Sequence, residues 1–489
     1  MKPKRPHVAD TPKPLGRRRA GRNPARGEAP TARLRQGYVG QARLRAADKA
    51  HVWHPFTAMA EWVAGDPVVI ASGRREFLVD TEGTRYIDGV SSLWCNLHGH
   101  GRREIDKAIR DQLGRIAHST LLGLASPPSI ELAERLVALA PKGLERVFYS
   151  DSGATAVEVA LKMAYQYWRQ CPKPQPRRTK FVNLSLGYHG DTIGAVSVGG
   201  IAQFHALYRP LLFETIQAPA PYCYRCPMDA EPAACGMACA AEMERILADR
   251  ADQVAAVILE PLVQGAGGMI THPPGYLKRV AAACHRHEVL LICDEVATGF
   301  GRTGRMFACE HEQVRPDLLC LAKGISGGYL PLAATLAAGR IYEAFLGDPA
   351  AGRTFFHGHT YTGNALACAA GLASLEIFKK DRVLNRIGKL AAAMAEHLKP
   401  LAEMPHVGEV RQRGLMVGIE LVADRQTRRT YPAEERRGWR ACLAARKHGV
   451  WVRPLGDVVV LMPPYCISDR NLARLVAAVR DGIAGVTEP

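Results

Sequence analysis

The sequence predicts an α/β protein in which a mainly parallel sheet is covered by helices. From about residue 51 onward, short apolar runs alternate with segments of helical period. These runs are largely apolar, as expected for strands buried on both faces of a parallel sheet. The chain of 489 residues is 47% hydrophobic and 23% charged, which supplies a large core. We therefore expect an ordinary globular protein with two domains.

The first clear element is a helix over 104–116, where Ile105, Ala108, Ile109, Leu113 and Ile116 share one face. Five short apolar strands follow, separated by helix-length segments, at 147–149, 180–184, 254–259, 289–293 and 318–322. From about residue 379 the pattern changes to a helix, short strands and a final helix. This last part suits a smaller second domain.

The net charge of +17 is concentrated in the first fifty residues, which hold 14 Lys and Arg against 3 acids. Because this segment has several prolines and little periodic apolar content, we expect a disordered, basic extension over 1–45. It lacks serine, unlike an organellar transit peptide. The expected interpretations are a dispensable extension, a start site placed upstream of the true one, or non-specific polyanion binding.

The rest of the composition argues against export and membrane insertion. No run of eighteen apolar residues occurs, and the first fifty residues lack the apolar core of a secretory signal. The thirteen cysteines are an odd number, and several lie inside apolar runs. This usage is typical of reduced thiols, so we expect a cytoplasmic protein.

Two polar residues follow apolar strands where a parallel sheet gathers its ligands. Lys323 ends the run 318–322, and Asp294 ends the run 289–293. A desolvated, uncharged lysine can form a Schiff base with an aldehyde, and a carboxylate can keep a pyridine nitrogen protonated. Together they indicate pyridoxal phosphate, which needs both partners.

Three further segments could complete such a site. Residues 150–158 follow a strand and open a helix rich in small residues, which favours either phosphate binding or a plain helix cap. In 187–192, an aromatic side chain between glycines could stack on a flat ring or simply pack in a loop. Residues 355–364 offer a hydroxyl and amides before another Ala-rich helix, as a phosphate contact or a cap.

The run from Asp294 to Gly304, with Lys323 after it, resembles the signature of class III pyridoxal-phosphate aminotransferases. Segments at 53–57, 91–100, 187–192 and 453–465 further resemble the branch that converts 8-amino-7-oxononanoate to 7,8-diaminononanoate in biotin synthesis. The resemblance implies a fold-type I homodimer with a mainly parallel, seven-stranded sheet. It also implies a large cofactor domain over 103–378 and a smaller α+β domain built from 46–102 and 379–489.

The resemblance also implies roles for individual residues. Lys323 would form the Schiff base and move the proton, and Asp294 would pair with the pyridine nitrogen. Gly153 and Ala154 would hold the phosphate. Tyr188 would stack on the cofactor, take part in catalysis and line the substrate pocket.

Other roles would fall on residues farther along the chain. Thr360, with Gly358 and His359, would reach the site of the neighbouring subunit, with Thr360 touching the phosphate. Arg453 would pair with the substrate carboxylate, a task that suits its two-pronged guanidinium.

The amino donor is less clear. Members that use S-adenosylmethionine typically have a tyrosine where this chain has Phe56 and two tryptophans where it has Leu93 and Trp94. A lost phenol hydroxyl and a lost indole face are each worth on the order of 1 kcal/mol. The combination found here resembles the branch that includes lysine-using enzymes. S-adenosylmethionine and L-lysine are both expected candidates.

One motif is not required by the resemblance. Cys223, Cys226, Cys235 and Cys239 form the pattern C-x2-C, eight residues, C-x3-C. Such spacing can bind zinc or an iron–sulfur cluster, or the thiols can lie in a loop without metal.

Rival functions also remain. The nearest is another class III aminotransferase acting on an omega-amino acid or a diamine. A basic nucleic-acid binder on an enzyme scaffold would show salt-sensitive binding that depends on the extension.

Overall fold

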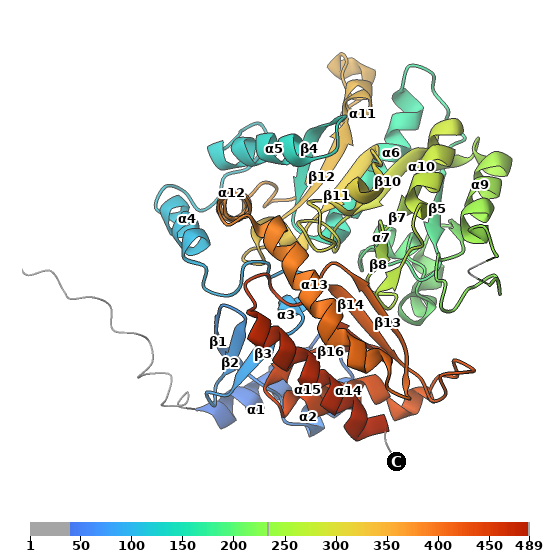
Figure 1. The fold of residues 1–489 in the computed structure, drawn as a ribbon. Helices are drawn as coiled ribbons and strands as arrows, with labels where there is room; N and C mark the ends of the chain where they lie inside the picture. Colours follow the sequence, from blue (N-terminus) through green and yellow to red (C-terminus); the bar gives the residue numbers. More distant parts are fainter. Residues whose placement is uncertain (1–39, 232–233, 488–489) are drawn as a thin grey trace, which may run out of the picture. The chain divides into compact units, whose positions relative to one another are not determined.

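A seven-stranded sheet with the order β4-β12-β11-β10-β7-β5-β6 dominates the computed structural model, which describes residues 40–231 and 234–487 (Figure 1). Its strands are β4 (Leu144–Ser150), β5 (Lys180–Leu184), β6 (Ile216–Ala218), β7 (Val254–Leu259), β10 (Leu290–Asp294), β11 (Leu318–Leu321) and β12 (Ala333–Ala338). Only β12 runs antiparallel to its neighbours, β4 and β11. The predicted mainly parallel sheet is therefore confirmed.

All five predicted strands form, with ends shifted by up to three residues. The two strands that the sequence did not predict, β6 and β12, are atypical. The former has three residues, and the latter reads Ala-Ala-Thr-Leu-Ala-Ala, a composition that favours a helix. The buried position of β12 between β4 and β11 overrides that preference.

Helices cover both faces of this sheet (Figure 1). Leu290 and Ile292 of β10 pack in one buried cluster with residues of α6 (Gly153–Gln170). Leu291 and Cys293 belong to the buried cluster that contains residues of α10 (Tyr276–Arg286). Because successive side chains enter opposite apolar layers, the strands lack polar alternation.

The remaining helices around this sheet range from four to sixteen residues. The predicted helix over 104–116 is α4 (Arg103–Leu113). The others are α5 (Pro127–Leu139), α7 (Ile193–Ser197), α8 (Ala202–His205), α9 (Ala238–Arg250), α11 (Gly339–Ala344) and α12 (Ala365–Lys380).

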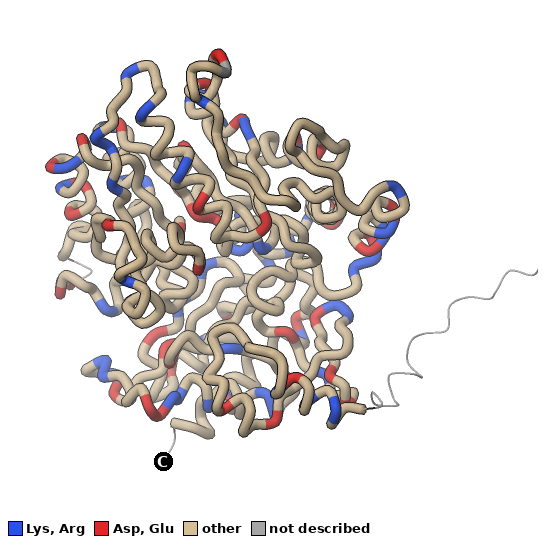
Figure 2. The backbone as a smooth tube through the Cα atoms, turned by 180° about the vertical axis from the view of Figure 1, so that it is seen from behind, with Lys and Arg blue, Asp and Glu red and all other residues tan. Residues whose placement is uncertain are grey.

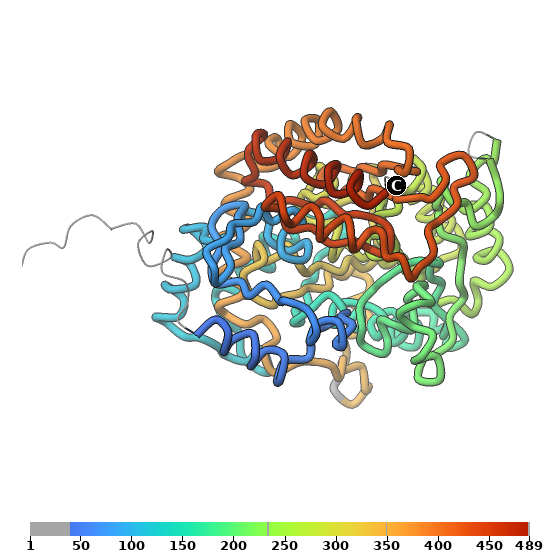
Figure 3. The backbone as a smooth tube through the Cα atoms, turned by 90° about the horizontal axis from the view of Figure 1, so that it is seen from below, coloured from blue at the N-terminus to red at the C-terminus, as the bar shows by residue number. Residues whose placement is uncertain are grey.

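Two four-stranded sheets lie outside the large one. One contains β1 (Ile70–Arg74), β2 (Phe77–Asp80), β3 (Arg85–Asp88) and β15 (Val450–Trp451), so it joins distant parts of the chain. The other contains β13 (Val407–Arg413), β14 (Met416–Leu421), β17 (Val458–Leu461) and β16 (Arg453–Leu455). Figure 3 shows the helices α13 (Val383–Ala402), α14 (Arg437–Arg446) and α15 (Asp469–Thr487) stacked beside one another in orange to red. The pair β8 (Val263–Gln264) and β9 (Ile270–Thr271) forms a small hairpin.

Among the described residues, 40–67 together with 81–83 form a separate unit. It contains α1 (Gln41–His51) and α2 (Met59–Ala64), and Asp48 accepts a hydrogen bond from Trp62 Nε1 at 2.8 Å. The predicted disordered extension needs a correction, because its residues 41–45 are helical and Arg45 pairs with Asp66 and Glu82. Residues 1–39 of that extension lie outside the described part of the chain.

Of the helices in the two described ranges, none combines the length and apolar character that crossing a bilayer requires.

Candidate active site

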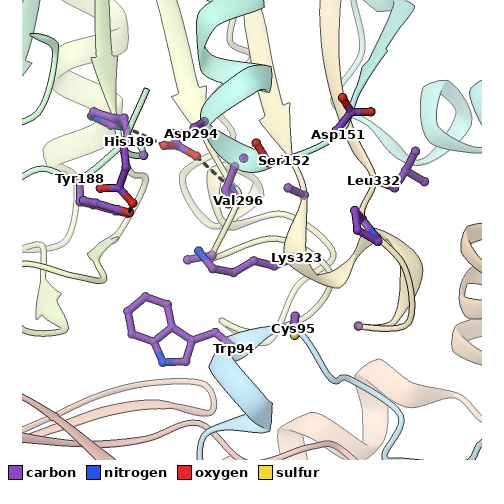
Figure 4. A pocket seen from close by; sticks show the side chains of 18 of the residues that line it. Trp94, Cys95, Asp151, Ser152, Tyr188, His189, Asp294, Val296, Lys323 and Leu332 are labelled. Atoms are coloured by element: carbon purple, nitrogen blue, oxygen red, sulfur yellow. Dashed lines mark hydrogen bonds and ion pairs between the residues drawn. The ribbon is translucent and has the colours of Figure 1, made fainter. Parts of the chain in front are cut away.

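A cavity of about 700 Å³ opens at the carboxyl edge of the large sheet (Figure 4). Six residues predicted for the site line it: Trp94, Gly153, Ala154, Tyr188, Asp294 and Lys323. They come from the short helix α3 (Ser91–Trp94), the start of α6, the turn after β5, the end of β10 and the turn after β11. The cavity therefore lies where ligands of parallel sheets are expected, at the carboxyl ends of the strands.

Lys323 opens a 3-10 turn, Lys323–Ser326, directly after β11. Its amino group lies 5.2 Å from the centre of the Trp94 ring, and Figure 4 shows the side chain extended across the cavity above that ring. Burial lowers the pKa of Lys323, against the opposing effect of Asp294 and Glu260. The uncharged amine, which is the nucleophilic form, is thereby favoured.

Asp294 is buried at the end of β10, paired in register with Cys320 of β11. Its Oδ2 lies 2.7 Å from His189 Nδ1, and its Oδ1 accepts the N–H of Val296 at 3.0 Å. His189 Nε2 is buried and has no hydrogen-bond partner among the described residues. The carboxylate is fixed from two sides and faces the cavity (Figure 4).

The start of α6 is both capped and able to bind an anion. The Ser152 hydroxyl accepts the Thr155 N–H, and the Thr155 hydroxyl accepts the Ser152 N–H at 2.9 Å. This reciprocal cap leaves the N–H groups of Gly153 and Ala154 at the helix terminus, where the dipole favours negative charge. The two interpretations of residues 150–158 are thus compatible.

The walls around this terminus fit only small residues. A Cβ on Gly153 would lie 2.6 Å from Val296 Cγ1. A Cβ on Gly190, whose φ is +125°, would lie 2.3 Å from the Cβ of Ala154. The turn that carries Tyr188 is therefore pressed against the start of α6.

Tyr188 is held at both ends. Its N–H donates to Glu260 Oε1 at 3.0 Å, and its hydroxyl donates to Asp191 Oδ2 at 2.7 Å. Burial and the hydrogen bond to Asp191 raise the pKa of Tyr188, so the phenol stays protonated and donates. The ring orientation is fixed by this pair of contacts.

Sequence reasoning missed Glu260 as a member of the site. It follows β7 directly, is buried, and accepts the N–H of Gly265 at 2.8 Å in addition to that of Tyr188. Burial raises the pKa of Glu260 to about 7. The signal was available, because Glu260 follows the strand 254–259 as Asp294 follows its own strand.

Several predicted site residues do not line this cavity: Leu93, Gly358, His359, Thr360 and Arg453. His359 comes nearest, since its Nδ1 lies 2.8 Å from Oδ2 of Asp151, a lining residue. The carbonyl of Thr360 accepts a hydrogen bond from His118 Nε2 at 2.9 Å if that nitrogen is protonated. Phe56 belongs to the separate unit, where its side chain is 61% exposed and its φ is +49°.

The four cysteines of the C-x2-C motif come together around another cavity of about 390 Å³. Burial raises the pKa of Cys239 to about 11, which keeps that thiol protonated. Within residues 40–231 and 234–487, no three His, Cys, Asp or Glu side chains are arranged to hold a metal ion. Both interpretations of this motif, a metal site and loop thiols without metal, stay predictions.

The first cavity fits pyridoxal phosphate in three respects. It offers a lysine amine for an aldehyde, a fixed carboxylate for a pyridine nitrogen, and two amides at a helix terminus for a phosphate. The tight contacts of Gly153 with Val296 and of Gly190 with Ala154 keep side-chain bulk away from the two amides at that terminus.

Comparison with known proteins agrees with this chemistry. Residues 58–483 match the family model described as aminotransferase class-III. A curated relative from Nitratidesulfovibrio vulgaris, named adenosylmethionine-8-amino-7-oxononanoate aminotransferase, is 59% identical over 91% of this chain and 82% of its own length.

Two solved structures match almost as widely. The crystal structure of an enzyme with that same name from Methanocaldococcus jannaschii has a TM-score of 0.86 and 45% identity, over 91% of this chain and 99% of the other. An amine transaminase from an uncultivated Pseudomonas species, solved in its PLP-bound form, has a TM-score of 0.85 and 40% identity, over 89% and 99%. The chain therefore belongs to the class III aminotransferases, which depend on pyridoxal phosphate.

Proposed function

We propose that this protein transfers an amino group to 8-amino-7-oxononanoate and produces 7,8-diaminononanoate, a step of biotin synthesis, with S-adenosylmethionine as the donor. The observation that carries the proposal is the placement of Lys323 and Asp294 in one cavity with the capped start of α6. The relative that is 59% identical carries the name of this reaction and this donor.

Pyridoxal phosphate, when bound, supplies an aldehyde and an electron-withdrawing ring that stores the electron pair released from the donor carbon. We assign its phosphate to Gly153 and Ala154, its ring nitrogen to Asp294 and its aldehyde to Lys323. Asp294 keeps a proton at the ring nitrogen, and His189 and Val296 hold that carboxylate still.

The freed Lys323 amine would be the base that takes the proton from the donor carbon and carries it to the cofactor carbon on the other side of the transferred nitrogen. Its lowered pKa suits this task, because the amine must be uncharged to accept the proton. Trp94 lies below the amine and excludes water from that side. Tyr188 orients the ring of the cofactor and lines the substrate pocket.

We further propose that the protein acts as a homodimer, in which Thr360, Gly358 and His359 of each subunit complete the other subunit's site. Thr360 is exposed and its carbonyl meets His118, and the stretches of sequence around both residues carry large apolar side chains that face solvent in the single chain. These include Leu113, Leu122, Leu124, Phe356 and Tyr361. Sedimentation analysis of the purified protein tests this, and a monomer with full activity would exclude it.

Other assignments are proposed on the same basis. We place the cofactor domain over 103–378 and the smaller domain over 46–102 and 379–489, supported by the sheet that pairs β3 with β15. We assign Arg453 to the substrate carboxylate. A cytoplasmic location is supported by thirteen cysteines that are all free thiols.

A second donor is favoured by one observation of the sequence. Phe56 and Leu93 stand where members that use S-adenosylmethionine typically have aromatic residues with more polar or stacking surface. L-lysine would suit that combination. An omega-amino acid or a diamine is a third alternative, supported by the 40% identity to an amine transaminase.

The deciding experiment supplies purified, cofactor-loaded protein with 8-amino-7-oxononanoate and either donor, and measures 7,8-diaminononanoate by mass spectrometry. Product with S-adenosylmethionine supports the proposal as stated. Product with lysine alone would make Phe56 and Leu93 markers of the donor. No product with either, but turnover of an omega-amino acid, would refute the proposed acceptor.

A further inference from the structure

A second large cavity, of about 680 Å³, is lined by an excess of arginines and shares no residue with the first. Five arginines are among its lining residues: Arg74, Arg75, Arg102, Arg103 and Arg386. Its lining acids are Glu104 and Asp381. Nothing in the proposed reaction uses these side chains.

The two lining acids are already engaged. Arg102 donates to Glu104 at 2.8 and 2.9 Å and to Asp381 at 2.7 Å, so both carboxylates are bound to one arginine. Burial lowers the pKa of His98, another lining residue, to about 3, so His98 adds no charge. Arg75, another arginine of the lining, forms an ion pair with the buried Glu76.

Three arginines remain without a carboxylate. Arg74, Arg103 and Arg386 make no ion pair with any residue in the described ranges. Their three positive charges face one cavity, which costs free energy unless an anion or salt offsets the repulsion. Arg103 also opens α4, whose terminal N–H groups add to the positive potential.

Part of this cluster is oriented in advance. Arg386 Nε donates to the carbonyl of Tyr465 at 2.6 Å, and its Nη2 donates to that of Ile467 at 2.9 Å. Main-chain hydrogen bonds of 2.8 Å in both directions tie Arg75 to His100, another lining residue. Guanidinium groups held by main-chain carbonyls lose less side-chain entropy when they bind a ligand.

We propose that this second cavity binds a small oxyanion with at least two negative charges, held by Arg74, Arg103 and Arg386. The ligand class is a molecule with a phosphate or with two carboxylates, because both match the planar, paired donors of arginine. In Figure 2 the helix at the right of the view, α4, carries both basic and acidic residues, and its first residue is Arg103. This site is independent of the proposed reaction.

The test titrates the cofactor-saturated protein with inorganic phosphate and, separately, with succinate by calorimetry at constant ionic strength. Saturating the protein with pyridoxal phosphate removes the competing phosphate site at α6. The test variant is Arg74→Ala combined with Arg103→Ala, since both side chains are exposed and unpaired among the described residues. The matched control is Arg440→Ala, an exposed arginine on α14 that lines neither cavity.

We expect one saturable site per chain for at least one probe, with affinity at least tenfold weaker in the double variant and unchanged in Arg440→Ala. Tighter binding of phosphate or of succinate identifies which source of oxyanion the site prefers. Arg103→Lys, which keeps the charge but loses the paired donors, should give intermediate affinity and guards against a folding defect. Absence of saturable binding by both probes, or equal affinity in the double variant, would overturn the proposal.

Discussion

The contact between Gly190 and the start of α6 gives the sharpest prediction. Gly190→Ala places a Cβ 2.3 Å from the Ala154 Cβ and 2.7 Å from its Cα, so the clash is with atoms that cannot rotate away. The φ of +125° adds strain for a residue with a side chain. A positive φ costs roughly 1–2 kcal/mol, and overpacking costs roughly 1–3 kcal/mol. We expect a total loss of about 2–5 kcal/mol of unfolding free energy.

Gly143→Ala is the matched control. Its φ is +101°, but a Cβ there would meet nothing within 4 Å, so it carries the backbone strain alone. Urea unfolding of the cofactor-free variants measures the difference between them. The clash should also displace the turn that bears Tyr188, so pyridoxal phosphate should bind at least tenfold more weakly to Gly190→Ala and normally to Gly143→Ala. Equal destabilisation of both variants, or unchanged cofactor affinity in Gly190→Ala, would refute the reasoning.

Three other predictions concern residues that line the first cavity or adjoin its lining: Lys323, Ser152 and Glu295. Lys323→Ala should abolish turnover and remove the absorbance band of lysine-bound cofactor, and retained turnover would exclude Lys323 as the base. Ser152→Ala removes the acceptor for the Thr155 N–H and should cost about 1 kcal/mol of unfolding free energy. The control is an alanine substitution of an exposed serine that caps no helix. Burial raises the pKa of Glu295 to about 7, above its ordinary value of 4.5, so the folded protein keeps a proton that the unfolded chain releases. The Glu295 contribution to stability is full below pH 4.5 and falls by on the order of 3 kcal/mol as pH rises through 7. The destabilisation of Glu295→Gln relative to the parent should therefore shrink between pH 5 and pH 8, and a constant difference would contradict the assignment.

The strands of the large sheet and two residues of the site could be predicted because these strands are buried. Strands such as β7 and β10 are buried on both faces, so their apolar runs are unambiguous, and the residue after each run enters the site. Asp294 and Lys323 were identified by that rule. Glu260 also follows such a run, but its partners, the N–H groups of Tyr188 and Gly265, are set by the fold and cannot be read from the local sequence.

The rest depends on contacts that no local pattern encodes. The Ala-rich β12 is a strand because it lies between two other strands, which its own residues do not reveal. The second cavity brings together Arg74, Arg103 and Arg386 from three distant elements. Leu93, Gly358, Thr360 and Arg453 lie outside the first cavity, and their predicted roles depend on a second subunit or on substrate.

The position of β12 also constrains the order in which the molecule can be built. Among the described strands, β4 pairs in the large sheet only with β12, through partners such as Ser150 and Ala333. The first strand of this sheet to leave the ribosome, β4, therefore joins it only after the last one, β12, has been made, and the turn at Gly153 is delayed with it. Such long-range closure is slow and leaves strand edges exposed. Chains truncated before residue 333 should consequently aggregate or bind chaperones.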